Sequence, residues 1–301
     1  MKRRNVRFLR GLAFRLAVWL VVLVLVPALA LADLEIRFMN VGQGDCTIVE
    51  CDGKAMIIDG GPADVSGFLY SYIRNDLKLR HVDVVISTHP HADHVGGLGA
   101  VLNAVPADVV YSPVTRWDSA GFRSLLRYAD RQGTPVVVPE TGDVLELGGA
   151  TVTILSCIRD ISGWGSTSVN DMSTVVRIDY GRTAFIIAAD AEFAAEQMML
   201  SSGLPLKADV LRIGHHGSRT ATCEEFLETV SPSFAVISCG RGNDYGHPHR
   251  PTLSRLQKRN ITLFRTDLQG NILCRSDGKT VAFSTDWQAR TSVYAAPQTG
   301  S

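Results

Sequence analysis

Residues 88–97 read Thr-His-Pro-His-Ala-Asp-His-Val-Gly-Gly, and this segment is the chemically densest part of the chain. It directly follows Asp-Val-Val-Ile-Ser, residues 83–87, a short apolar run that predicts a buried strand. Three His and one Asp fall within six residues, and imidazole nitrogens and carboxylate oxygens are ligands of first-row metals. On an extended stretch His89 and His91 point the same way, whereas the Asp-His pair after them opens a helix and faces elsewhere. One short segment can therefore serve two metal positions.

On both sides of this segment, strand and helix patterns alternate. Short runs rich in Ile, Val, Phe and Met predict strands at 34–40, 46–51, 55–58, 83–87, 107–111, 135–138, 143–147, 150–155, 173–179, 183–188, 208–213, 233–238, 261–264, 270–275 and 280–284. Helices are predicted at 66–77, 93–103, 118–132, 191–201, 222–230 and 251–259. Two β-rich halves, each ending in helices, indicate an α/β (α+β) chain in which two sheets pack face to face with helices outside.

The first 32 residues have the pattern of an export signal. Six basic residues up to Arg15, with no acid, precede the apolar run Leu16–Leu31, which ends in the small-residue site Ala30-Leu31-Ala32. We expect cleavage after Ala32 and a secreted or periplasmic protein. The alternative is an uncleaved membrane anchor, for which the 17 residues up to Ala32 are short. The expected organisation is a signal peptide or anchor over 1–32, a folded domain over 33–286 and a C-terminal tail over 287–301.

Composition and charge limit the class of protein. The 301 residues are 46% hydrophobic and 20% charged, which excludes wholesale disorder, collagen and coiled coil. Beyond residue 32, 24 basic residues face 30 acidic ones, a net charge of −6. A domain of that charge is not built as a general polyanion binder, although a local basic surface is compatible with it.

The six cysteines show no Cys-x-x-Cys spacing, so a zinc ribbon or thioredoxin-type site is unsupported. An even number in an exported chain permits disulfides. Four of them lie in apolar strand-like runs: Cys46, Cys157, Cys239 and Cys274. We therefore expect most of the cysteines to be free and buried.

Five further motifs accompany the histidine cluster along the chain. They are Asn40-Val41-Gly42-Gln43-Gly44-Asp45, Ile58-Asp59-Gly60-Gly61, Ala189-Asp190, Gly214-His215-His216-Gly217-Ser218 and Gly246-His247-Pro248-His249. With the His-x-His-x-Asp-His cluster, this series resembles the metallo-β-lactamase superfamily, in particular the hydrolase domain of ComEC-type competence proteins. The resemblance covers residues 34–285. It implies an αββα sandwich of two mixed sheets, with a two-metal site at one edge.

The resemblance also implies roles for individual residues. The metal ligands are His89 and His91 on one divalent ion, Asp93, His94 and His215 on the other, and Asp190 between them. Zinc is expected, with manganese as the alternative. The catalytic group comprises Asp93, His216 and His247, with His216 facing the substrate. Strand alternation cannot settle the order of His215 and His216, because both lie at a strand end.

One departure from the family pattern concerns the first metal. The superfamily usually places another histidine before the bridging Asp, but residues 95–189 contain none. The equivalent stretch, Asn170-Asp171-Met172-Ser173, resembles the Asn-x-x-Ser of ComEC-type domains. The first site is therefore expected to be poor in ligands, with Asn170 or Asp171 nearby and Asn170 as a candidate for substrate binding. This counts against an antibiotic-resistance enzyme.

Further candidate residues for substrate binding each have a structural alternative. Asp45 stabilises the tight turn before it or binds substrate. Ser218 caps the next segment or touches substrate, and Arg219 is a solvated charge or a phosphate partner. His247 and His249, aimed alike by the proline between them, form a surface pair, or donate a proton and bind phosphate.

Residues 241–265 carry six basic residues against one acid, a local charge of +5. This segment is either a solvated helix face or an anion-facing rim beside the metals.

These observations favour an exported metal-dependent hydrolase that acts on an anionic ester, a phosphodiesterase or nuclease. Single-stranded DNA is the substrate that the resemblance implies, and small phosphodiesters are the alternative within this class. The other candidates are a lactonase or β-lactamase, and a non-catalytic metal-binding module in DNA uptake. We expect no obligate protein partner, and membrane contact only through an uncleaved N-terminal segment.

Overall fold

Two β-sheets form the centre of the structure. The computed structural model describes residues 33–159 and 168–297. In this part of the chain the first sheet has eight strands, in the order β15 (Val281–Thr285), β14 (Ile272–Ser276), β1 (Leu34–Phe38), β2 (Thr47–Cys51), β3 (Lys54–Ile58), β4 (Val82–Ile86), β5 (Ala107–Tyr111) and β6 (Val136–Val137). The second has seven, in the order β13 (Thr262–Arg265), β12 (Phe234–Ile237), β11 (Val210–Arg212), β10 (Thr183–Ile187), β9 (Val175–Tyr180), β8 (Ala150–Ser156) and β7 (Val144–Leu147).

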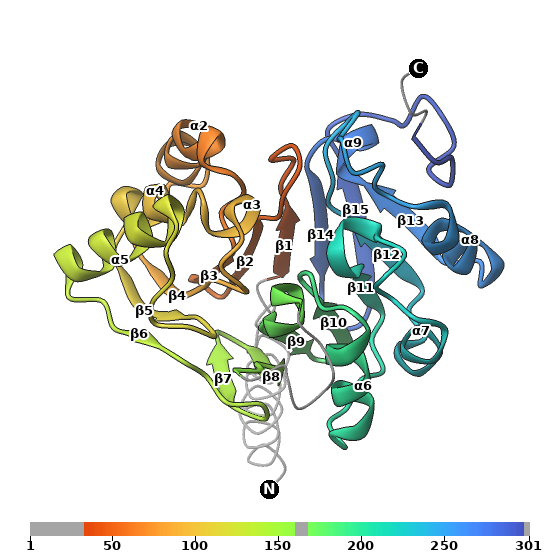
Figure 1. The fold of residues 1–301 in the computed structure, drawn as a ribbon, viewed down its shortest axis with the longest axis horizontal. Helices are drawn as coiled ribbons and strands as arrows, with labels where there is room; N and C mark the ends of the chain where they lie inside the picture. The colour runs from red at the N-terminus through yellow and green to blue at the C-terminus, as the bar shows by residue number, and fades with distance from the viewer. Residues whose placement is uncertain (1–32, 160–167, 298–301) are drawn as a thin grey trace, which may run out of the picture. The chain divides into compact units, whose positions relative to one another are not determined.

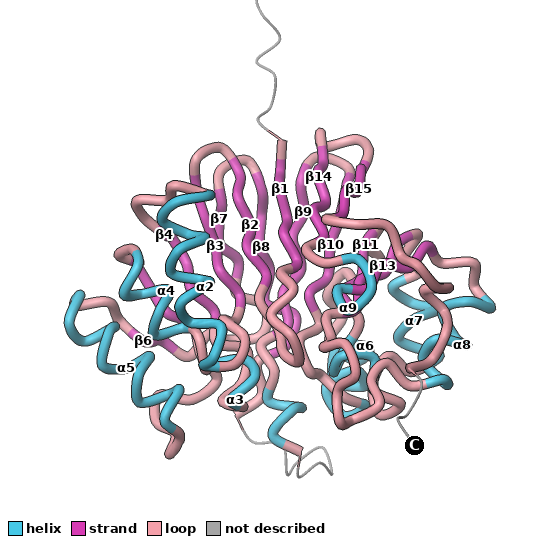
Figure 2. Tube along the Cα trace, turned by 90° about the horizontal axis from the view of Figure 1, so that it is seen from above, coloured by secondary structure: helices cyan, strands magenta, loops and turns pink. Residues whose placement is uncertain are grey.

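Helices cover the outer face of each sheet, as Figures 1 and 2 show. The first sheet carries α2 (Ser66–Ser71), continued by the π-helical turn η2 (Tyr72–Asp76), with α3 (Ala92–Val95), α4 (Leu98–Ala104) and α5 (Ala120–Gln132). The second carries α6 (Phe193–Ser201), α7 (Glu224–Val230), α8 (Arg250–Lys258) and α9 (Thr266–Gln269). Short 3₁₀ turns are η1 (Ala63–Val65), η4 (Val169–Met172) and η5 (Gly214–Gly217). Both sheets are mixed, with β3–β6 and β10–β13 parallel. The expected αββα sandwich is confirmed.

The hydrophobic core is layered in the same way. In β4, Val84 and Ile86 pack between the two sheets, whereas Val82 and Val85 pack under the helices of the first sheet. A strand that is apolar on both faces must be covered on both, which explains the continuous Val-Ile run before the histidine cluster. The buried strand that the sequence predicts here positions the cluster at one edge of the sheet.

The single helix expected over 93–103 is two helices. α3 ends at Val95 and α4 begins at Leu98, with Gly96 and Gly97 between them. The apolar periodicity of the segment continues across the break, so the pattern alone does not reveal it.

Close backbone packing explains this break. A Cβ on Gly97 would lie 2.0 Å from the carbonyl oxygen of Gly60. The Gly60 amide donates to the His94 carbonyl (2.8 Å), and the Gly97 amide donates to the Gly61 carbonyl (3.0 Å). The loop after β3 thus contacts the α3–α4 junction through its backbone, which brings Asp59 against His94.

The described part of the expected C-terminal tail, residues 287–297, is held against β13. Arg265 donates to the carbonyl oxygens of Val293 (2.9 Å) and Ala295 (2.6 Å). The Tyr294 hydroxyl donates to the carbonyl oxygen of Ile261. This segment therefore forms a fixed wall beside α8.

All six cysteines lie in the described part of the chain and are free. Five are buried and Cys223 is half-buried. The expectation of free buried cysteines is confirmed for most of them, and burial raises the pKa of each thiol.

The expected export signal over 1–32 and its cleavage site after Ala32 lie outside the described residues. Among the residues that are described, no helix combines the length and the apolar composition needed to cross a bilayer.

Candidate metal centre

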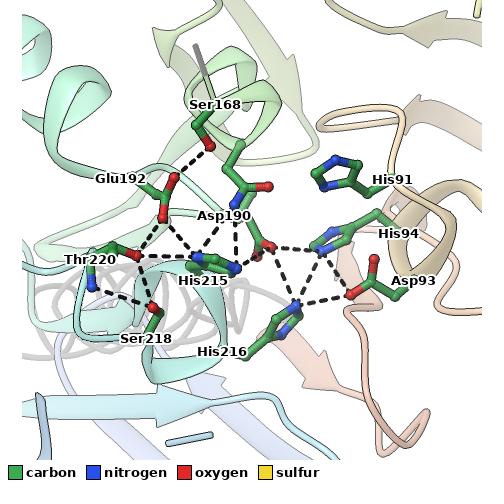
Figure 3. A network of polar contacts seen from close by, with 12 residues as sticks. His91, Asp93, His94, Ser168, Asp190, Glu192, His215, His216, Ser218 and Thr220 are labelled. Carbon is green, nitrogen blue, oxygen red and sulfur yellow. Dashed lines mark hydrogen bonds and ion pairs between the residues drawn. The ribbon is translucent and has the colours of Figure 1, made fainter. Parts of the chain in front are cut away.

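The potential ligands come from strand ends of both sheets and from one short helix. They are His89 and His91 after β4, Asp93 and His94 in α3, Asp190 after β10, and His215 and His216 after β11. Because β10 and β11 are parallel neighbours, their carboxyl ends lie at the same edge of the second sheet. Figure 3 shows four of these side chains turned toward one another: Asp93, His94, Asp190 and His216.

These four side chains define what we call the second metal position. His94 Nε2 lies 3.3 Å from His216 Nε2 and 3.3 Å from Asp190 Oδ2. His216 Nε2 lies 3.4 Å from Asp190 Oδ2 and 3.3 Å from Asp93 Oδ2, and Asp93 Oδ2 lies 3.8 Å from His94 Nε2. Tetrahedral ligands on bonds of about 2.0–2.2 Å are separated by about 3.3–3.6 Å. The donor spacing therefore fits a tetrahedral metal site.

The first metal position has fewer donors. His89 Nε2 lies 3.1 Å from His91 Nδ1 and 3.9 Å from Asp190 Oδ2. Asp190 thus borders both positions. The Asn170 amide, in the segment that stands in for the missing histidine, lies 3.3 Å from His215 Nε2.

Hydrogen bonds behind each ring determine which nitrogen faces the centre. His94 Nδ1 lies 2.7 Å from Asp59 Oδ2, and His216 Nδ1 lies 2.9 Å from the carbonyl oxygen that follows β12. The Thr88 hydroxyl donates to Asp59 Oδ2 (2.6 Å), so its oxygen accepts from His89 Nδ1 (3.1 Å). Each Nδ1 therefore donates, so the Nε2 atoms of these three rings are the nitrogens that face the centre. Once deprotonated, three converging Nε2 atoms can bind a cation.

The charges at the centre also favour a cation. Burial opposes ionisation of Asp190, but His216 and His94 outweigh it and hold the pKa of Asp190 well below its usual range. Burial disfavours charge on His216, yet Asp190 and Asp93 raise its pKa to about 9. The pKa of His94 is likewise raised well above its usual value, since the surrounding carboxylates outweigh burial. Protons or a divalent ion can balance these carboxylates, and ligand imidazoles release their protons when a metal binds.

The structure reverses the expected order of the histidine pair. His216 is buried and contacts Asp93, His94 and Asp190, whereas His215 Nε2 lies 3.8 Å from Asp190 Oδ2 and has no such contact with the other two in the described part of the chain. Both histidines have left-handed backbone angles, with φ of 44° and 52°. Strand alternation therefore does not apply to the turn η5, and geometry makes His216 the ligand candidate.

His215 instead pairs with Glu192, a residue that the sequence analysis missed. His215 Nδ1 lies 3.0 Å from Glu192 Oε1, as Figure 3 shows. Burial raises the pKa of Glu192, but hydrogen bonds from His215, Ser168 and Thr220 outweigh it and bring the pKa to about 2. Glu192 is thus ionised, and His215 Nδ1 donates to it. Nothing in the sequence around Ala191-Glu192 signals this contact, which joins residues 23 positions apart.

Asp45, expected to bind substrate, lies behind the centre. Its Oδ2 lies 2.7 Å from Nη2 of Arg212, a fully buried guanidinium that also donates to the Ile213 carbonyl (2.8 Å). Arg212 Nη1 is 3.8 Å from Asp190 Oδ1. The pair therefore supports Asp190 instead of meeting substrate. A charged residue at the end of the apolar run Val210-Leu211-Arg212 is the signal that could have identified Arg212.

A cavity of about 340 Å³ opens onto the centre. It is lined by Gln43, His91, Ala92, Asp93, Asn170, Asp190, His215, His216, Tyr245 and His247. Asn170 and His247, two of the candidates from the sequence, therefore line this cavity. Gln43 and Tyr245 were missed, although both belong to or adjoin the motifs.

His247 is a neutral imidazole at neutral pH. Burial, His216 and His215 lower its pKa to about 3. Its Nδ1 is buried and lacks a hydrogen-bond partner among the described residues. The ring can donate one N–H to a bound oxygen, but it carries no additional proton to release.

Three other substrate-binding candidates do not line this cavity. Ser218 forms a local turn, in which its hydroxyl lies 2.8 Å from Thr220 Oγ1 and accepts from the Thr220 amide (3.3 Å). A local structural role therefore describes Ser218 better than contact with substrate. The Arg219 amide donates to His249 Nδ1 (3.0 Å), and both residues line a separate hollow beside the centre.

The basic residues of segment 241–265 are mostly exposed, but most of them also contact other parts of the chain. Four of its six basic side chains have partners inside the protein: Arg241, Arg255, Arg259 and Arg265. Arg265 is fully buried and lies 2.6 Å from Asp267. Tertiary contacts thus absorb most of the local positive charge.

Comparison with known proteins agrees with this geometry. The sequence model described as the Metallo-beta-lactamase superfamily matches residues 39–241. ComE operon protein 3 of Bacillus subtilis is 28% identical over 267 residues, covering 83% of this chain and 34% of the relative. Recombination protein 2 of Haemophilus influenzae is 27% identical, covering 79% of this chain and 28% of the relative. The chain thus spans about a third of the length of these curated relatives.

The likeness extends to solved structures. The metallo-beta-lactamase fold protein YhfI from Bacillus subtilis superimposes with a TM-score of 0.52, covering 81% of this chain and all of that one. At 14% sequence identity this match shows a shared fold. Both the spacing of the donor atoms and the fold of the chain are therefore those of a site for divalent metal ions.

Proposed function

This chain belongs to the metallo-β-lactamase superfamily, and on that premise we propose that it is a metal-dependent phosphodiesterase of the ComEC-like type. The observation that carries the proposal is the convergence of imidazole and carboxylate donors on Asp190, beside a cavity with two further histidines. Single-stranded DNA is the substrate that the resemblance to ComEC-type domains implies, and a further relative is named Competence protein ComA of Neisseria gonorrhoeae. We propose that the protein acts outside the cytoplasm, because of its N-terminal pattern.

In this mechanism the chain's own residues hold and orient the reacting groups. Asp93, His94, Asp190 and His216 would hold one ion, and His89 and His91 with Asp190 would hold the other. Bound divalent ions supply a water of lowered pKa and neutralise charge on the phosphoryl oxygens. Arg212, fixed by Asp45, keeps Asp190 in place behind the centre.

Two histidines at the cavity would contact the substrate. His215, oriented by Glu192, presents its Nε2 toward the cavity and can pass a proton to the leaving oxygen. His247, which stays neutral, can donate a hydrogen bond to a phosphoryl oxygen. The role assigned to His216 in the sequence analysis thus passes to His215.

The test is hydrolysis of bis-p-nitrophenyl phosphate by the full chain, stripped of metal and then supplied with zinc or manganese. We expect turnover that returns with metal and is lost in Asp190→Ala. Turnover that persists in Asp190→Ala would contradict the mechanism. Metal binding without turnover, on this ester and on lactones, would indicate a non-catalytic module.

A further inference from the structure

A second, larger hollow adjoins the metal cavity. Its volume is about 1060 Å³, just above the ~300–1,000 Å³ usual for ligand pockets. It is lined by Arg219, Tyr245, Gly246, His249, Arg250 and Pro251 and by residues 294–297. Tyr245 lines both spaces, so the two hollows meet at this residue. A ligand that fills only the metal centre leaves this space unused.

The hollow is positively charged. Arg219 and Arg250 are exposed, and neither guanidinium has a carboxylate within ion-pair distance among the described residues. No acidic residue lines the hollow in that part of the chain. The amino end of α8, which begins at Arg250 with no acid in its first turn, adds its partial positive charge. Two arginines without counter-ions beside a helix amino end favour an anionic ligand.

The hollow also offers aromatic surface. Tyr245 is 67% exposed, and one face of its ring stacks on His247 at a centroid distance of 5.7 Å. Tyr294 also lines the hollow, and its hydroxyl donates to the carbonyl oxygen of Ile261. An exposed, pre-positioned ring next to unpaired arginines is the combination that binds bases and phosphates of a single strand.

We propose that this hollow is a binding subsite for the nucleotides next to the scissile phosphodiester of a single-stranded nucleic acid. Arg219 and Arg250 contact its phosphates, and Tyr245 stacks on a base at the junction with the metal cavity. The inference rests on the proposed function for the position of the scissile bond. It also explains how a domain with a net charge of −6 beyond residue 32 can bind a polyanion. The positive charge that contacts the strand is local, because Arg219 and Arg250 line the same hollow.

The test measures binding without turnover. Fluorescence anisotropy of a labelled oligothymidylate of about 12 nucleotides is followed with the metal-free full chain at several salt concentrations. The variant is Arg219→Gln with Arg250→Gln. Its matched control is Arg127→Gln with Arg131→Gln, two exposed arginines on α5. All are checked for native thermal unfolding.

We expect the Kd of the Arg219/Arg250 variant to rise about tenfold or more, and the slope of log K against log salt to fall by about 1.4, the value for two phosphates on a single strand. Tyr245→Leu is expected to weaken binding about tenfold with an unchanged slope. An unchanged Kd, or an equal loss in the α5 control, would overturn the subsite. Inorganic polyphosphate that displaces the strand equally well from wild type and Tyr245→Leu would overturn base stacking.

The two proposals fail separately. Ester turnover without oligonucleotide binding rejects the subsite and keeps the phosphodiesterase. Oligonucleotide binding that depends on Arg219 and Arg250, without any metal-dependent turnover, keeps the subsite and rejects the phosphodiesterase.

Discussion

The two candidate metal positions share residues 89–94 and Asp190, yet they differ in how firmly their donors are held. At the second position four donors lie within 3.3–3.8 Å contacts, and two of its imidazoles are fixed from behind by Asp59 and a backbone carbonyl. At the first, Thr88 holds His89 from behind, but His91 is half-buried and, among the described residues, the only hydrogen-bond contact of its ring is with His89. Supporting hydrogen bonds, more than the motif itself, determine how well a position is organised. We therefore expect the second position to bind its ion more tightly.

The largest effect is expected from His216→Ala, which removes one donor of the second position. Loss of that ion removes several kcal/mol of stabilisation of the transition state, so hydrolysis should fall about 10³-fold. Calorimetric titration with zinc should show the tighter of two binding events lost, together with ester turnover.

Two control variants, which leave the donors of the second position in place, show whether the effect is specific to that position. His91→Ala leaves all four donors of the second position in place, so only the weaker binding event should be lost. His215→Ala should retain both. If His215→Ala abolishes tight binding and His216→Ala does not, the order given by the structure is wrong.

A smaller effect, a loss of metal affinity, is expected from Asp59→Asn. Asp59 accepts from His94 Nδ1 and from both the amide and the hydroxyl of Thr88, so its charge orients a ligand without touching the metal. Loss of such a partner weakens metal affinity about 10–100-fold. Competition with a chromophoric chelator measures it, with the exposed Asp64→Asn as the control for charge. If Asp59→Asn and Asp64→Asn bind the metal with equal affinity, Asp59 does not orient the ligand.

The smallest effect on the metal centre is expected from Glu196→Gln. Glu196 is buried and accepts hydrogen bonds from the amides of Thr222 and Cys223. Burial raises its pKa to about 7, because it outweighs the effect of these hydrogen bonds and of the nearby Arg255 charge, which lower the pKa. A raised pKa contributes stability at low pH, which is lost as pH rises from the unfolded value of 4.5 through about 7. The loss is on the order of 3 kcal/mol.

Urea unfolding of metal-free protein between pH 5 and pH 8 measures this difference. Relative to wild type, Glu196→Gln should gain stability as pH rises, while zinc affinity at both positions stays the same. A constant difference across this range would show that Glu196 does not titrate there.

Local patterns predicted the fold well where a strand or helix is determined by its own sequence. In β4 the Val-Ile run indicated a strand covered on both faces, and that is its environment. The break at Gly96-Gly97 escaped prediction because its cause is a contact with Gly60, 37 residues away. Long-range backbone packing leaves no periodic trace in the sequence.

The same distinction applies to the site. The histidine cluster was found because its donors are neighbours in sequence. The order of His215 and His216 was not, because left-handed backbone angles turn the chain after β11. Glu192 and Arg212 support the centre through contacts that only the folded chain creates. The local charge of residues 241–265 did not by itself predict a surface for anions, because two acids and two carbonyl groups elsewhere in the chain pair with four of its arginines.

The contact between Gly60 and Gly97 has a consequence for how variants of this protein are classified. Neither residue carries a functional group, yet a methyl group at Gly97 would collide with the Gly60 carbonyl at 2.0 Å. Relief of that collision requires α3, with Asp93 and His94, to move away from β3. In a saturation library scored by activity, these two positions would be as intolerant as the metal ligands themselves. A screen of that kind would count them among the catalytic residues, and only a separate assay of folding would tell the two groups apart.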